Sequence, residues 1–130
     1  TMRVLDSDHC IELLRGRLDL RGRVDANELL GITSITVGEL MHGAHRSAQR
    51  QRNLARVEVL LAAVLVLPFD ERAARSFGGL KAELEHSGQR LADLDLQIAS
   101  ICLATQSTLL THNMRHFGRI VGLALDDWLI

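Results

Sequence analysis

The sequence is poor in aromatic residues, in proline and in cysteine. Its 130 residues include no tyrosine, one tryptophan, three phenylalanines and one proline. So few aromatic rings argue against base stacking as the main way to capture a nucleic acid. Cys10 and Cys102 are too few for a disulfide framework and have no metal-type partner in sequence. Because both lie among apolar residues, we expect two reduced thiols in the core of a cytoplasmic protein.

No apolar run approaches the length of a membrane span, and the chain does not open with the basic and then apolar pattern of a signal peptide. The formal net charge is −1, which gives no global attraction to nucleic acid. Arginine supplies nearly all of the positive charge, with Lys81 as the only lysine. Arginine suits phosphate because its planar guanidinium can donate to two oxygens at once.

Short apolar strands alternate with helical patterns along the chain. We expect strands at residues 3–7, 29–35, 65–69, 107–111 and 121–125, and helices at residues 10–16, 36–47, 53–64, 71–88 and 91–104. Asp70 is expected to cap the N-terminus of the fourth helix. This alternation predicts an α/β fold, a single domain over residues 1–130, with a parallel sheet of about five short strands and helices on both faces. In such sheets the ligand crevice lies at the carboxyl ends of the strands.

Four polar residues are expected to meet at that edge. Asp6 closes the first strand, Glu39 follows the second, and Asn113 follows the fourth, two residues after Thr111. Asp95 opens a helix that runs antiparallel to the strands and therefore starts at the same edge. Crowded carboxylates repel one another unless a hard cation such as Mg²⁺ or Mn²⁺ holds them. Such an ion can activate a water for attack on a phosphodiester, so the expected chemistry is phosphodiester hydrolysis.

The two aspartates that open residues 91–104 are expected to differ. Asp95 shares the inward helix face with Ile98, Ala99 and Cys102, where a lone carboxylate is costly without a cation. Asp93 lies on another face and is interpreted as the N-cap, or as a charge that suits the positive end of the helix.

Each candidate also has a purely structural explanation. Asp6 can end a strand and cap the next helix. Thr36 and Glu39 fit a capping box, in which Glu39 only satisfies a backbone donor. Asn113 after a strand is often turn chemistry. The metal-site hypothesis therefore depends on convergence of all four residues.

The chain resembles a known family in four successive blocks, which are VLDSDHCIELLRG, ITSITVGELMHGAHRS, LPFDERAARSFGGLKAELEHSGQRLADLDLQIASICLA and TLLTHNMRHFGRI. Their order is similar to that of the PIN-domain ribonucleases, and within these to the VapC toxins of bacterial toxin–antitoxin pairs. The resemblance runs from Met2 to near Ile130.

The resemblance implies a single-strand-specific endoribonuclease that depends on Mg²⁺ or Mn²⁺ and blocks translation by cutting a structured RNA, with tRNA as the expected substrate class. It implies an acidic metal site of Asp6, Glu39 and Asp95, with Asp6 and Asp95 as direct ligands and Glu39 completing the site or acting through water. Ser7 and Thr111 are supporting neighbours. It also implies a homodimer and a cognate VapB-type antitoxin whose tail fills the active-site groove, often with an arginine in the acidic pocket.

Two positions depart from the family pattern. Many PIN domains have a fourth aspartate where this chain has Asn113, which leaves a second tightly bound metal open. Asp8 stands where many relatives have asparagine, and we hypothesise that it partly restores the missing charge. Candidate contacts to the RNA backbone are Arg15, Arg17, Arg46 and Arg50. His9 and His112, beside the acidic residues, are candidates to touch phosphate, and the helix at residues 53–64 is a candidate partner interface.

Two alternative functions are carried forward. A haloacid-dehalogenase-like phosphatase would use Asp6 as nucleophile and Asp8 as general acid, but its motif order fails because Lys81 precedes Thr111. A catalytically inactive PIN-like module that binds RNA or a partner is kept open by Asn113.

Overall fold

The computed structural model describes residues 2–130 and is built around a five-stranded sheet. The strands are all parallel and lie in the order β3-β2-β1-β4-β5. Their bounds are Arg3–Leu5 for β1, Leu30–Thr33 for β2, Leu65–Leu67 for β3, Thr108–Leu110 for β4 and Ala124–Asp126 for β5. The predicted parallel sheet of five short strands is confirmed.

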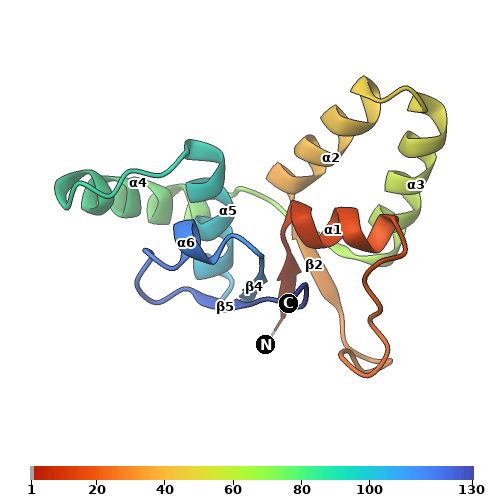
Figure 1. The fold of residues 1–130 in the computed structure, drawn as a ribbon. Helices are drawn as coiled ribbons and strands as arrows, with labels where there is room; N and C mark the ends of the chain where they lie inside the picture. The colour runs from red at the N-terminus through yellow and green to blue at the C-terminus, as the bar shows by residue number, and fades with distance from the viewer. Residues whose placement is uncertain (1) are drawn as a thin grey trace.

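The helices cover the sheet from both sides (Figure 1). They are α1 (Ser7–Leu14), α2 (Ser34–Arg46), α3 (Arg50–Ala63), α4 (Glu71–His86), α5 (Asp93–Ala104) and α6 (Met114–Phe117). In Figure 1, α1, α2 and α3 lie on one side of the strands and α4, α5 and α6 on the other, and α2 and α3 form a hairpin that projects beyond the sheet. The predicted two-sided cover is therefore also confirmed.

Alternation along the central strands divides the core into two clusters. Val4 and its register partner Leu109 pack in the cluster beneath α4 and α5. Leu5 and its partner Leu110 point the other way and pack beneath α1, α2 and α3. All four side chains are fully buried, as expected for parallel strands covered on both faces.

The start of α2 differs from the prediction. Thr33 is the N-cap, and its side-chain oxygen accepts a hydrogen bond from the backbone N–H of Thr36 at 3.1 Å. The predicted strand at residues 29–35 therefore ends two residues early, and the proposed capping box of Thr36 and Glu39 is wrong. Thr33 combines a buried strand position with a capping side chain, which is why the sequence pattern alone misplaced the boundary.

Two further predicted caps, at α4 and α5, have different outcomes. Asp70 caps α4, with its carboxylate accepting from the backbone N–H of Ala73 at 3.0 Å, as predicted. At α5 the N-cap is Ala92, so the assignment of Asp93 as a cap is wrong. Asp93 is the first residue of the helix, where its charge suits the positive helix end, and it pairs with Lys81 Nζ at 2.9 Å.

The C-terminal segment packs on the sheet through Trp128, which is 7% exposed. Its indole ring lies 5.6 Å from the Arg3 guanidinium and 5.4 Å from that of Arg23. Both cysteines are free and buried, and burial raises the pKa of each thiol to about 12. Within residues 2–130, none of the helices has both the length and the apolar character needed to cross a bilayer.

We expect Trp128→Ala to lower the free energy of unfolding by about 3–5 kcal/mol, because it removes a large buried side chain and leaves a cavity. Chemical denaturation followed by circular dichroism measures the change. Val121→Ala is the matched control, since Val121 is 95% exposed and its truncation should cost less than about 0.5 kcal/mol. Equal destabilisation by the two variants would contradict the packing role of Trp128.

Candidate functional site

Asp6 is the most buried acid of the site. It follows β1 directly and caps α1, with Oδ1 accepting from the backbone N–H of Ser7 at 2.9 Å. Its Oδ2 accepts from the hydroxyl of Thr111 at 2.8 Å. Burial raises the pKa of Asp6 despite these two hydrogen bonds, and the charges of Asp8 and Asp95 raise it further. The capping role therefore does not by itself explain why a carboxylate is buried at this position, because burial disfavours its charged form.

Thr111 links Asp6 to the loop after β4. Its hydroxyl donates to Asp6 and accepts from the backbone N–H of Asn113 at 3.0 Å. The Asn113 side-chain nitrogen lies 2.9 Å from Nδ1 of His116, and because an amide nitrogen only donates, the imidazole nitrogen accepts. Asn113 is thus oriented by Thr111 on one side and by His116 on the other.

Glu39 projects from α2 with one oxygen unsatisfied. Its Oε1 is buried and has no hydrogen-bond partner among the described residues. Burial raises the pKa of Glu39, and the charges of Asp6 and Asp95 add to the increase. A buried carboxylate oxygen without a donor is costly unless a water or cation satisfies it.

Asp95 lies in the first turn of α5, on the face that it shares with the buried Ile98 and Ala99. Burial is the largest influence on Asp95 and raises its pKa above the ordinary value. Asp93 is instead held at the α4 side by Lys81. The two aspartates therefore separate as predicted, with Asp95 directed to the site.

Three carboxylates from three different elements thus act on one another electrostatically. Asp6 and Asp95 both disfavour the charged form of Glu39, and Asp95 disfavours that of Asp6. Within residues 2–130, no three imidazole, thiol or carboxylate groups are already gathered in a metal-binding arrangement. The oxygen-only donor set and the unsatisfied Glu39 oxygen fit an ion such as Mg²⁺, which binds through one or two carboxylates and keeps several waters.

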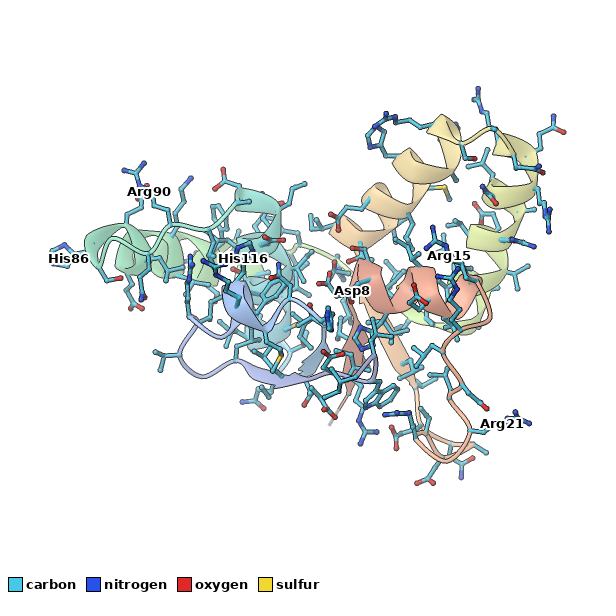
Figure 2. All side chains as sticks on the ribbon, in the orientation of Figure 1. Asp8, Arg15, Arg21, His86, Arg90 and His116 are labelled. Atoms are coloured by element: carbon cyan, nitrogen blue, oxygen red, sulfur yellow. The ribbon has the colours of Figure 1, made fainter. Side chains whose placement is uncertain are left out.

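Asp8 lies beside these acids in a different environment. Burial would raise its pKa, but hydrogen bonds from the His9 ring and the backbone N–H of His112 outweigh that effect and hold the pKa below its usual value. Figure 2 shows Asp8 near the middle of the molecule, between the side with α1, α2 and α3 and the side with α4, α5 and α6. His9 is fully buried, so the prediction that it touches phosphate is wrong, whereas His112 is exposed.

A groove of about 420 Å³ runs between α1, α2 and α3 and reaches Ser7 and Glu39. Leu40 and Val57 contribute to an apolar floor, and Arg15 lies on its wall. Figure 2 places Arg15 near the far end of α1, towards α3. The other predicted RNA contacts, Arg17, Arg46 and Arg50, are exposed and do not line this groove.

Sequence reasoning missed the placement of His116. It lies in α6, a helix of four residues that is too short to show a periodic pattern. The available signal was its position three residues after Asn113, which puts both side chains on one face of a single helical turn. Arg56 was also not assigned to the site, although it lines the groove on the side of α3.

Comparison with known proteins places this geometry in a family. The PIN domain profile matches residues 3–123. The chain is 31% identical to "Ribonuclease VapC2" of Haemophilus influenzae over 97% of both chains, and 35% identical to "tRNA(fMet)-specific endonuclease VapC" of Salmonella typhimurium over 96% of both.

Solved structures agree with these sequence matches. VapBC2 from Rickettsia felis, bound to a promoter DNA fragment, contains a chain that superposes with a TM-score of 0.91 at 27% identity, covering 98% of this chain and 99% of that one. DNA-bound VapBC from Salmonella typhimurium gives a TM-score of 0.90 at 34% identity, covering 98% of both chains. The chain therefore belongs to the PIN-domain family, and its relatives include VapC ribonucleases.

Proposed function

We propose that this protein is the toxin of a toxin–antitoxin pair, an endoribonuclease that depends on Mg²⁺ or Mn²⁺ and cuts a structured RNA of the tRNA class. The observation that carries the proposal is the buried, unsatisfied oxygen of Glu39, placed among carboxylates that raise its pKa. Family membership supports the same reaction, because relatives at 31–35% identity over nearly the whole chain are ribonucleases.

Each side chain of the site has a separate task in this proposal. Asp6 and Asp95 would hold the divalent ion, which when bound would activate a water and neutralise charge on the phosphate. Glu39 accepts a proton from the attacking water. Its raised pKa makes its carboxylate a stronger base than an ordinary glutamate. Asn113 contributes its side-chain oxygen to a water or to the ion. The water oxygen bonds to phosphorus as the phosphorus–oxygen ester bond breaks, and the released ribose oxygen takes up a proton from solvent.

The proposed partners follow from the same surfaces. The solved relatives are VapBC complexes, so a VapB-type antitoxin is the expected inhibitor. The groove from Val57 to Glu39 offers an apolar floor that ends at an acidic pocket, which suits an apolar segment followed by an arginine. We also propose a homodimer, with α3 as a candidate contact because Val59 on this helix is 72% exposed.

The phosphatase and the inactive PIN-like module are both less well supported than the nuclease. Membership of the PIN-domain family contradicts the haloacid-dehalogenase assignment. The inactive module differs from the nuclease in one measurable respect, which is binding of RNA without cleavage in either metal.

Purified protein should cut total tRNA in the presence of Mg²⁺ and lose this activity with a chelator. Asp6→Asn and Asp95→Asn should each lower the rate at least about a hundredfold, because each removes a charged ligand from the metal site. Denaturing gel electrophoresis of the RNA measures the rate. Asp93→Asn is the matched control, since Asp93 lies two residues from Asp95 but pairs with Lys81 and should leave the rate within about twofold.

Two outcomes would overturn this assignment. Equal cleavage by the wild type and both site variants would identify a contaminating nuclease. RNA binding by the wild type with no cleavage in Mg²⁺ or Mn²⁺ would favour the inactive module.

The repulsion among the carboxylates also predicts an effect on stability. We expect Asp95→Asn to raise the melting temperature of the metal-free protein by about 2–5 °C, since it removes one member of the repelling group. Mg²⁺ should raise the melting temperature of the wild type and have little effect on the variant. Differential scanning fluorimetry measures both shifts, and an unchanged or lower melting temperature of metal-free Asp95→Asn would count against the repulsion.

The pH dependence has a defined sign. In the folded protein the pKa values of Asp6, Glu39 and Asp95 lie above their ordinary values, which are 3.8 for aspartate and 4.5 for glutamate. For each group, the folded state therefore binds more protons than the unfolded state at pH values between its ordinary pKa and its raised pKa. These three groups therefore lower the stability of the metal-free protein as the pH rises through that interval, and Mg²⁺ affinity rises over the same interval. Titration of Mg²⁺ at several pH values tests this, and affinity that is independent of pH would contradict it.

A further inference from the structure

Both carboxylate oxygens of Asp8 already accept hydrogen bonds from the protein. Oδ1 lies 2.7 Å from Nδ1 of His9, and Oδ2 accepts from the backbone N–H of His112 at 2.8 Å. The hydroxyl of Thr111 is also 3.4 Å from Oδ2, but its single proton is directed to Asp6 at 2.8 Å. Asp8 therefore connects α1 to the loop that follows β4.

The His9 ring carries this connection through the core to the C-terminal segment. The backbone N–H of Trp128 donates to Nε2 of His9 at 3.0 Å, so Nε2 is an acceptor and the ring proton is on Nδ1, facing Asp8. Asp127 Oδ1 is farther from Nε2, at 3.7 Å, and accepts instead from the backbone N–H of Leu129 at 2.8 Å. The His9 ring is fully buried, and only the form with its proton on Nδ1 can both donate to Asp8 and accept from the Trp128 amide.

The same C-terminal segment also holds the loop after β4 directly. The backbone N–H of Thr111 donates to the carbonyl of Asp126 at 2.9 Å, and Nδ1 of His112 lies 2.7 Å from Oδ2 of Asp127. The loop that orients Asn113 and hydrogen-bonds to Asp6 is thus held by Asp8 on one side and by residues 126–127 on the other. His9 joins the two supports.

We propose that Asp8 is a positioning residue for the nuclease site, fixing Thr111 and Asn113 through the His112 amide and joining them to the C-terminal segment through His9 and Trp128. This role differs from the charge-restoring role suggested by the sequence, because both oxygens are committed to donors of the protein. Its consequence for the reaction rests on the proposed function, while the linkage itself is measurable without RNA or metal.

The geometry explains why a carboxylate stands at this position. Two donors, the His9 Nδ1–H and the His112 N–H, face the two oxygens of Asp8, whereas an asparagine has one acceptor oxygen and one amide that donates. If the amide faced His9, the ring proton would have to move to Nε2, where it would meet the N–H of Trp128. Asp8→Asn therefore leaves at least one of the His9, His112 and Trp128 donors without an acceptor.

The first test uses the unaltered, metal-free protein. Nuclear magnetic resonance of ¹⁵N-labelled protein should show the His9 proton on Nδ1 and a scalar coupling between the Trp128 amide nitrogen and His9 Nε2. A His9 ring protonated on Nε2 would overturn the proposal. This measurement decides the matter even if Asp8→Asn does not fold.

The second test compares Asp8→Asn with Glu83→Gln, which removes one exposed charge from α4. Without metal, Asp8→Asn should shift the His9 ring signals and the amide signals of His112 or Trp128, and Glu83→Gln should shift none of them. In tRNA cleavage, Asp8→Asn should lower kcat roughly ten- to a hundredfold with KM within about twofold, since the substrate binds but the site is misplaced.

The outcomes separate this inference from the proposed function. In one outcome, Asp8→Asn leaves the signals of His9, His112 and Trp128 unmoved but lowers Mn²⁺ affinity about tenfold or more by calorimetry. That result would make Asp8 a metal ligand and overturn its positioning role. Unmoved signals with unchanged affinity would overturn it too. If the wild type cuts no RNA, the proposed function fails, while the metal-free spectra still decide whether Asp8 holds the loop.

Discussion

Repulsion among Asp6, Glu39 and Asp95, at the edge where parallel strands end, is the constraint on which the site depends. Burial disfavours the charged form of each carboxylate, and their mutual charges disfavour it for Asp6 and Glu39. The sheet and its two apolar clusters stabilise the fold strongly enough to hold these groups together. In the proposed function, a divalent cation held by the carboxylates would relieve this repulsion and stabilise the site relative to its metal-free state.

The acids reach this edge from separate parts of the fold. Asp6 follows the central strand β1, Glu39 comes from α2 on one side of the sheet, and Asp95 comes from α5 on the other. No single helix or strand therefore carries the site. Any change that shifts one cluster against the other alters the separation of the carboxylates, and this is why support from the core matters for the reaction.

Hydrogen bonds around Thr111 fix the position of Asp6 relative to the loop that follows β4. Thr111 joins Asp6 to Asn113, and Asp8 holds the neighbouring His112 amide. Asp8 and Asn113, the two positions at which the sequence was expected to depart from the family pattern, are therefore not equivalent. Asp8 is engaged on both oxygens by the protein, whereas the side-chain oxygen of Asn113 accepts no hydrogen bond from residues 2–130.

The sequence by itself predicted the parallel sheet, the order of its five strands and of the five longer helices along the chain, and a set of acids expected at the carboxyl edge of the sheet; the short helix α6 was not predicted. These features follow from local periodicity and from the rule that parallel strands end together, so they need no knowledge of distant contacts. Only the tertiary structure decided that Thr33 rather than Thr36 caps α2, that Ala92 rather than Asp93 precedes α5, and that His9 is buried against Trp128. The His9 ring accepts from the Trp128 amide across 119 residues of sequence, a pairing that is set by packing in three dimensions. The two helix starts are local features, but where each helix begins depends on where the packed strand or loop before it ends.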